Sequence, residues 1–206
     1  MIETTDDGAL RILTINRPEK ANSLTGEMLE ALRDAVDAAR DAPVLVLTGA
    51  GRVFSAGADL DAARAGLATS PLWEELSGAI AGHPGLTIAA LNGTAAGGAM
   101  GMVLACDLRI AAPQARIFYP VMKLGFLPQP SDPARLRALV GPARAKMILM
   151  AGQKIGAEEA REWGLIDRIV PQEALAETTR ELGADICAAA PDHTRAIKKL
   201  IDAPHL

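Results

Sequence analysis

Short aliphatic runs that alternate with amphipathic segments constrain the fold of this chain most. Residues 44–48 and 86–91 are largely apolar runs bounded by glycine, proline or asparagine, a pattern typical of strands buried on both faces. Residues 26–40, by contrast, carry apolar side chains at helical spacing with charged residues between them. Strands that alternate with helices favour an α/β fold with one continuous core.

The remaining segments extend the same alternation. We expect two further strands, at residues 8–16 and 107–111. Residues 120–133 contain four prolines, so we expect an irregular segment there. The helices that we expect after the first one cover residues 71–81, 102–106, 142–150, 157–163 and 171–190.

The composition argues against several classes of function. The 206 residues suffice for one domain, and a net charge of −4 without a cluster of Lys or Arg makes nucleic-acid binding a poor hypothesis. Every apolar run is interrupted by charges or glycines before it reaches the length of a membrane span. The three histidines lie far apart in the sequence, so we expect no metal site.

The N-terminal residues and the cysteines indicate the compartment. Residues 1–7 are acidic where a signal peptide is basic and then apolar. Cys106 and Cys187 are isolated, and without a secretion signal we interpret them as reduced thiols. We therefore expect a cytoplasmic protein.

A glycine-rich segment follows the first aliphatic run. Gly49-Ala50-Gly51 after a strand suggests a dinucleotide-binding fingerprint, but that fingerprint needs a third glycine where this chain has Phe54. Residues 56–59 form a second turn, whose small side chains let a ligand approach the backbone N–H groups. The alternative for residues 56–59 is an ordinary glycine turn without a ligand.

A second pair of glycines, Gly97 and Gly98, precedes an apolar helix. A helix N-terminus carries free N–H groups and a partial positive charge, so an anionic ligand could bind there. The alternative is a close contact between helix and strand that leaves no room for a side chain.

The two turns belong to an ordered set of short strings between about residue 8 and residue 171. The strings are Ile15–Leu24, Leu47–Gly49, Phe54–Leu60, Ala90–Gly93, Ala96–Gly98, Ala105–Arg109, Gly156–Ala160 and Gly164–Pro171. Each string is weak by itself, whereas the ordered set is highly specific. In this order the strings resemble the crotonase superfamily, the enoyl-CoA hydratase/isomerase family.

The resemblance implies an α/β fold, a ββα spiral with two roughly perpendicular sheets surrounded by helices, assembled as a homotrimer or hexamer. It also implies an acyl-CoA thioester as substrate, with CoA as part of that substrate and no permanently bound cofactor. By motif position, the amides of Ala58 and Gly98 form an oxyanion hole around the thioester oxygen. The further substrate contacts that it implies are Lys20, Ala21, Asn22, Leu24, Ala56, Asp59, Leu60 and Gly97.

Two positions depart from the hydratases of this family, which use two glutamates to activate and deliver water. Here the first position is Gly101, and the second, after Pro120, is Val121. Neither side chain transfers a proton, and adding water across a double bond needs a general acid and base. We therefore expect an inefficient enoyl-CoA hydratase.

Asp132 is the candidate acid/base residue, because its segment approaches the acyl end in relatives. A solvated loop carboxylate or a helix cap is the alternative for Asp132, and the nearby Tyr119 is a poor base. For Glu74 a helix surface, and for His83 a surface turn, are the simpler interpretations. Trp73 either lines the acyl pocket or packs in the core.

We divide the chain into a crotonase-like acyl-CoA-binding core, residues 1–190, and a short C-terminal extension, residues 191–206, in place of the longer helical region of relatives. Two functions remain open. The first is a crotonase-type lyase or isomerase that stabilises an enolate with non-standard acid/base residues. The second is a non-catalytic acyl-CoA-binding protein of the same fold.

Overall fold

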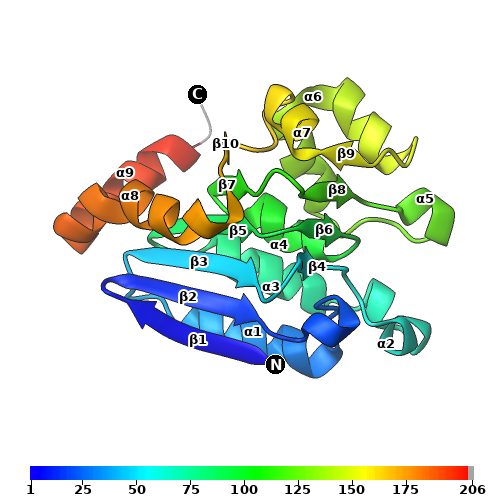
Figure 1. Ribbon diagram of the computed structural model, residues 1–206, viewed down its shortest axis with the longest axis horizontal. Coiled ribbons are helices and arrows are strands. Elements are labelled where there is room, and N and C mark those ends of the chain that lie inside the picture. Colours follow the sequence, from blue (N-terminus) through cyan, green and yellow to red (C-terminus); the bar gives the residue numbers. More distant parts are fainter. Residues whose placement is uncertain (204–206) are drawn as a thin grey trace.

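The computed structural model describes residues 1–203 and contains two mixed β-sheets (Figure 1). The larger sheet has the strand order β1-β2-β3-β5-β7-β10, and the smaller sheet has the order β4-β6-β8-β9. The strands of the larger sheet are β1 (Ile2–Asp7), β2 (Leu10–Ile15), β3 (Val44–Gly49), β5 (Leu86–Leu91), β7 (Leu108–Ala111) and β10 (Arg168–Ile169). Those of the smaller sheet are β4 (Val53–Ser55), β6 (Thr94–Ala96), β8 (Arg116–Phe118) and β9 (Ile155–Gly156).

Helices surround the two sheets. The α-helices are α1 (Gly26–Ala38), α2 (Leu60–Arg64), α3 (Leu72–Ala81), α4 (Ala99–Ala105), α5 (Val121–Leu124), α6 (Asp132–Leu149), α7 (Ala157–Glu162), α8 (Leu175–Ala188) and α9 (Pro191–Asp202). The 3-10 helices are η1 (Pro18–Lys20), η2 (Leu67–Thr69) and η3 (Gln172–Ala174). Within residues 1–203, none of these helices has the length and apolar character that a membrane crossing requires.

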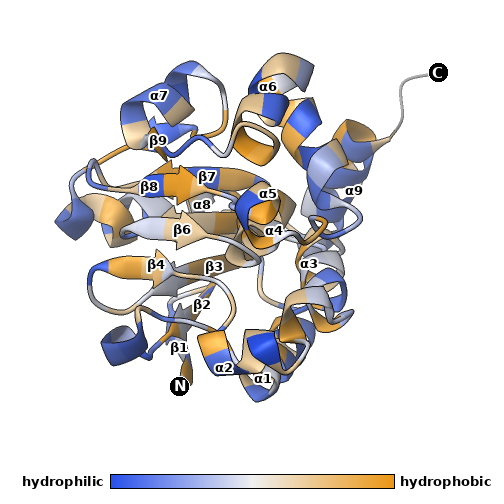
Figure 2. Ribbon diagram, turned by 90° about the vertical axis from the view of Figure 1, so that its right-hand side faces the viewer, coloured by the Kyte–Doolittle hydropathy of each residue, from blue (hydrophilic) through white to orange (hydrophobic). Residues whose placement is uncertain are grey.

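The chain passes from the larger sheet to the smaller one three times, and each passage leads into helices. The passages are β3 to β4, β5 to β6 and β7 to β8, and β4, β6 and β8 lie side by side (Figure 2). This ββα repetition confirms the α/β class and the spiral. The second strand of each passage has only three residues, which is too short for the sequence periodicity to reveal.

The central strands β3 and β5 of the larger sheet are buried on both faces, as their continuous apolar runs predict. The first four residues of β3 are at most 2% exposed. On one face β3 packs into the main core with α1, α3 and α4. On the other face Val44 contacts α8, where Gly183 comes so close that an added Cβ would lie 3.0 Å from Val44 Cγ2. The two layers of helices therefore fix the position of the sheet.

Most expected elements are confirmed, and the differences have local causes. Residues 8–16 are not a lone strand, because Gly8, with φ of +64°, turns β1 back onto β2 in an antiparallel hairpin. The segment 120–133 is not wholly irregular, since it contains α5. Residues 142–150 mostly continue α6 across a break at Gly141, whose φ is 78°.

The proposed C-terminal extension, residues 191–206, begins with a helix. Residues 191–202 form α9, and Lys198 on it donates to the Gly85 carbonyl at 2.9 Å and pairs with Asp107 at 2.6 Å. These contacts hold α9 against the amino-terminal ends of β5 and β7. Residues 204–206 lie outside the described residues.

Candidate active site

The two glycine turns meet because their strands are neighbours. Strand β4 runs parallel to β6, so the turns that follow these strands lie side by side. Gly57 has a φ of +89°, and a Cβ at this position would lie 2.7 Å from the Ala96 carbonyl oxygen and 3.2 Å from the Gly98 nitrogen. The backbones of the turns therefore touch, and a side chain at position 57 would separate them.

Among the backbone amides at this junction, those of Ala58 and Gly98 have no acceptor within residues 1–203. Leu24 forms a parallel bridge to Ala58, donating to the Gly57 carbonyl at 2.8 Å and accepting from the Asp59 amide at 2.8 Å. Because neighbouring amides of extended chain point to opposite sides, the Ala58 N–H faces away from Leu24. Gly98 is the N-cap residue of α4, where amides lack helical partners.

Both residues border one cavity of about 330 Å³. Its wall is largely apolar, and Arg64 is the only charged side chain in it. Trp73 closes one side and is 2% exposed, with its indole N–H donating to the Leu67 carbonyl at 2.8 Å. The full lining is Ala56, Ala58, Leu60, Ala63, Arg64, Ala68, Trp73, Ala96, Gly97, Gly98, Phe118, Tyr119, Pro120, Val121, Leu124, Phe126, Leu127 and Gln129. Trp73 thus both lines the cavity and packs in the core.

A second cavity of about 370 Å³ lies beside the first and shares Ala56, Ala58, Leu60 and Arg64 with it. Lys20 and Asp59 complete one side of this second cavity. Arg17 does not reach it, because its guanidinium pairs with Asp59 at 2.9 Å and is largely buried. The two cavities share part of their walls, and the outer one is lined by Lys20, Arg64, Asp59 and Asp61. Arg64 pairs with Asp61 at 3.0 Å, whereas Lys20 forms no ion pair within residues 1–203.

The structure brings together most of the predicted substrate contacts but separates three from the cavities. Ala21, Asn22 and Leu24 line neither of them. The Asn22 side chain is fully buried and donates to the carbonyls of Ala50 and Val53 at 2.9 and 2.6 Å. These residues hold the Ala56–Asp59 turn in place through the backbone.

Asp132 is buried, so the interpretation as a solvated loop carboxylate is wrong. The Tyr119 hydroxyl donates to Asp132 Oδ2 at 2.8 Å and accepts from the Gln129 amide at 3.4 Å. Tyr119 and Gln129 line the cavity, whereas Asp132 lies behind them, and its Oδ1 has no partner within residues 1–203. Burial raises the pKa of the Asp132 carboxyl to about 6, against the opposing effects of Tyr119 and the Arg135 charge.

Gly101 and Asp132 compete for the same space. A Cβ at position 101 would lie 3.2 Å from Asp132 Oδ1 and 3.4 Å from Oδ2. The carboxyl of Asp132 therefore sits where the side chain of residue 101 would begin. Val121, at the second departure from the hydratase pattern, faces the cavity with an aliphatic side chain.

Two further titratable residues differ from the expectations. His83 is 1% exposed rather than on the surface; its Nδ1 accepts from the Gly85 amide at 3.1 Å, and Nε2 lies 3.0 Å from the Ala39 carbonyl. Burial lowers the pKa of His83, so it is a neutral structural residue. Glu74 is half-buried and bonds Ser131 rather than projecting from a helix surface. Their short-range sequence context gave no sign of these partners.

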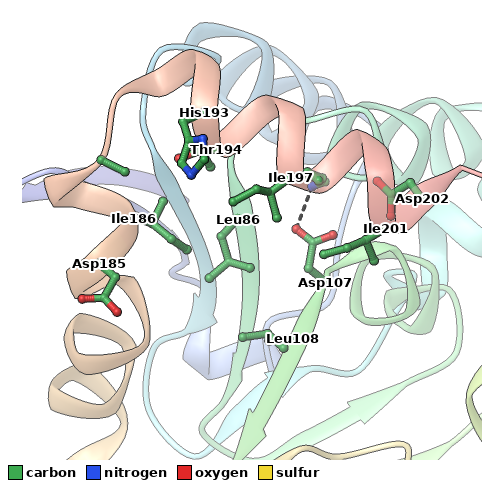
Figure 3. Close-up of a pocket in the computed structure, with 12 residues that line it drawn as sticks. Leu86, Asp107, Leu108, Asp185, Ile186, His193, Thr194, Ile197, Ile201 and Asp202 are labelled. Carbon is green, nitrogen blue, oxygen red and sulfur yellow. Dashed lines mark hydrogen bonds and ion pairs between the residues drawn. The ribbon is translucent and has the colours of Figure 1, made fainter.

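A third cavity of about 590 Å³, larger than the other two, lies elsewhere, between α8, α9 and the amino-terminal ends of β5 and β7 (Figure 3). Leu86 and Ile197 face each other across it, and the ion pair of Lys198 and Asp107 closes one end. Among residues 1–203, no glycine lines this cavity. Size alone therefore does not identify the site. Among residues 1–203, no group of three or more His, Cys, Asp or Glu is arranged to hold a metal ion.

Comparison with known proteins gives a consistent result. The profile of the family described as Enoyl-CoA hydratase/isomerase matches residues 5–205. A carnitinyl-CoA dehydratase of Salmonella enteritidis PT4 is 35% identical over 97% of this chain and 79% of its own length.

Solved structures agree with the sequence comparison. The crystal structure of an enoyl-CoA hydratase from Bacillus anthracis superposes with a TM-score of 0.90 at 33% identity, covering 97% of this chain and 81% of that one. An enoyl-CoA hydratase/isomerase from Pseudoalteromonas atlantica T6c gives 0.89 at 29% identity, covering 97% and 82%.

Proposed function

This chain belongs to the enoyl-CoA hydratase/isomerase family, and from that premise we propose that it binds an acyl-CoA thioester at the two glycine turns and stabilises its enolate. The observation that carries the proposal is the pair of unpartnered amides, Ala58 and Gly98, on turns whose backbones touch. An enolate places negative charge on the thioester oxygen. Fixed N–H donors stabilise that charge without reorganising, and one donor contributes about 3 kcal/mol in comparable sites.

The neighbouring surface suits the rest of the ligand. The apolar 330 Å³ cavity matches an acyl chain, while Lys20, which forms no ion pair within residues 1–203, offers positive charge to a phosphate at the second cavity. We further propose a homotrimer or hexamer, as the family resemblance implies, and a cytoplasmic location.

We also propose that the protein is an inefficient enoyl-CoA hydratase. Among residues 1–203 no carboxylate lines the 330 Å³ cavity, and the family resemblance places the two hydratase glutamates at Gly101 and Val121. Water would therefore lack a base in direct contact. Crotonyl-CoA should be hydrated far below the usual enzyme turnover of roughly 10 per second. Hydration near that rate would contradict this part of the proposal.

Replacing a backbone donor tests the oxyanion hole. Ala58→Pro removes an N–H that makes no hydrogen bond within residues 1–203, so the fold keeps its bonds to Leu24. We expect Ala58→Pro to lower acyl-CoA turnover about 100-fold or more, while Ala58→Ser, which keeps the N–H, retains most of it. Equal activity in both variants would exclude a role for this amide.

A non-catalytic acyl-CoA-binding protein is the second candidate, because the cavity lining contains no carboxylate, histidine or thiol. Calorimetry with hexanoyl-CoA, followed by turnover assays with enoyl-, β-keto- and malonyl-type esters, separates the two. Binding without turnover across the panel would select the second candidate.

A further inference from the structure

Tyr119 and Asp132 form a buried pair that the proposed oxyanion hole does not use. Tyr119 lines the cavity and its hydroxyl donates to Asp132 Oδ2 at 2.8 Å. Asp132 Oδ1 is buried and has no partner within residues 1–203. A buried carboxylate oxygen without a partner is costly, which favours uptake of a proton by this carboxyl group, and the Tyr119 O–H points at Oδ2, the oxygen that can receive it.

The space for this carboxyl exists because residue 101 is glycine. A Cβ there would come within 3.2 Å of Asp132 Oδ1. An acid group therefore lies beside residue 101, the position at which the family resemblance places a hydratase glutamate, but it is attached to α6 rather than α4. Tyr119, which bonds this group, lines the cavity together with Gln129.

We propose that Tyr119 is a catalytic residue that exchanges a proton with the α-carbon of a bound acyl-CoA, and that Asp132 acts through Tyr119 as the group that stores the proton. The inference rests on the proposed function, which supplies the thioester and the oxyanion hole. In the forward step the Cα–H bond breaks and its electron pair moves into the enolate. That proton bonds to the Tyr119 oxygen as the phenolic proton passes to Asp132. Reprotonation reverses each transfer, so no oxidant or reductant is needed.

The two proton transfers must occur in the same step. Burial and the adjacent carboxylate raise the pKa of the Tyr119 phenol, so a free phenolate does not form. Asp132 meets few other charges: Glu74 on α3 raises its pKa, and Arg135 on its own helix lowers it. The balance leaves a carboxyl group that titrates near pH 6 and is ready to accept a proton at neutral pH.

The test measures hydrogen exchange at carbon. The full chain is incubated with trans-3-hexenoyl-CoA in D₂O, and deuterium at the α-carbon is followed by mass spectrometry. We expect the wild-type rate to rise with pH around a midpoint near 6, since Asp132 must be deprotonated. Tyr119→Phe should lower the rate about 100-fold or more, and Asp132→Asn should lower it and abolish that midpoint.

Glu74→Gln is the matched control, because it removes a neighbouring charge and leaves the relay intact. It should retain the plateau rate and move the midpoint to lower pH, since a like charge no longer raises the pKa of Asp132. Thermal unfolding of each variant, followed by circular dichroism, shows that the fold is retained.

Acyl-CoA binding and the proton relay through Tyr119 and Asp132 can be tested separately. Calorimetry with hexanoyl-CoA, which has no double bond to move, measures binding alone. No binding by the wild type would overturn both the acyl-CoA function and the relay. Binding with an unchanged exchange rate in Tyr119→Phe, or with no wild-type midpoint between pH 5 and 7, would overturn the relay and leave the binding function standing.

Discussion

Because the Asp132 carboxyl is buried, the free energy of unfolding depends on pH. Its pKa is about 6 in the folded chain against 3.8 for the ordinary group, so the folded state holds more protons between these values. The contribution of Asp132 to stability is therefore present below pH 4 and is lost as pH rises through 6. The difference amounts to about 3 kcal/mol in the free energy of unfolding.

Asp132→Asn should remove this dependence. We expect the variant to gain up to about 3 kcal/mol relative to the wild type between pH 4 and pH 7, as measured by urea unfolding at several pH values. Asp192→Asn, at a side chain that is 96% exposed, is the control and should show no such gain. A constant difference between wild type and Asp132→Asn across this range would contradict the assignment.

A comparison of Gly57 with Gly66 distinguishes two reasons for a glycine, a positive φ and a lack of space for a Cβ. Both have positive φ, +89° and +103°, but a Cβ at Gly66 meets nothing within 4 Å, whereas one at Gly57 lies 2.7 Å from a carbonyl oxygen. We expect Gly66→Ala to cost about 1 kcal/mol and Gly57→Ala about 2 kcal/mol more in urea unfolding. Gly57→Ala should also abolish hexanoyl-CoA binding in calorimetry, whereas normal binding would show that turn contact is dispensable.

At the scale of elements, α4 and α6 are coupled through Gly101 and Asp132. Alanine at a helical glycine position normally stabilises by about 1 kcal/mol, but here its Cβ would press on the carboxyl group. We therefore expect Gly101→Ala to destabilise the wild type and to stabilise an Asp132→Ala background. The coupling from a double-mutant cycle in urea should therefore exceed about 1 kcal/mol. Additive effects would show that the two positions are independent.

The same contact limits attempts to restore hydration. Gly101→Glu would have to displace Asp132, so the glutamate alone should not bring crotonyl-CoA hydration to ordinary enzyme rates. A buried carboxyl and a glycine on different helices thus behave as one unit.

Helix α9 is held to the larger sheet by one polar anchor. Lys198 bonds Asp107 and the Gly85 carbonyl, and its side chain is 16% exposed. We expect Lys198→Met to lower the free energy of unfolding by about 1 kcal/mol and to speed amide hydrogen exchange in residues 191–202. Lys199→Met, at an exposed position, is the control. Unchanged exchange in Lys198→Met would show that apolar packing alone holds α9.

At the scale of the whole molecule, the sequence predicted what repeats over many residues. The helix from Gly26 and the buried strands β3 and β5 follow from periodicity, and the two glycine turns follow from motif and order. The three-residue strands β4, β6 and β8 carry no period, yet their pairing is what brings the turns together. Backbone pairing between distant segments is therefore the part that local patterns could not supply.

The same limit of local sequence patterns applies to the residues of the candidate site. The family resemblance predicts Ala58 and Gly98 by motif position, and both residues border the cavity. Asp132 was identified only as a candidate, since nothing near it in sequence reveals Gly101 or the Tyr119 hydroxyl as neighbours. The surroundings of Asp132 depend on how α4, α6 and the segment after β8 pack together, and no single segment of the sequence encodes that packing.

Ligand binding should stabilise the whole fold, because the cavity wall draws on α2, α3, β6, β8 and α5. A ligand that binds only the folded state at 100 times its Kd adds about 2.7 kcal/mol, which for a chain of this size raises Tm by about 5–10 °C. We expect hexanoyl-CoA to produce this shift in a thermal scan and free CoA at the same concentration to produce much less, since only the thioester oxygen reaches both amides. Ala58→Pro should lose most of the difference between the two ligands. Equal shifts with hexanoyl-CoA and CoA would mean that the nucleotide alone carries binding and that the turns do not hold a thioester.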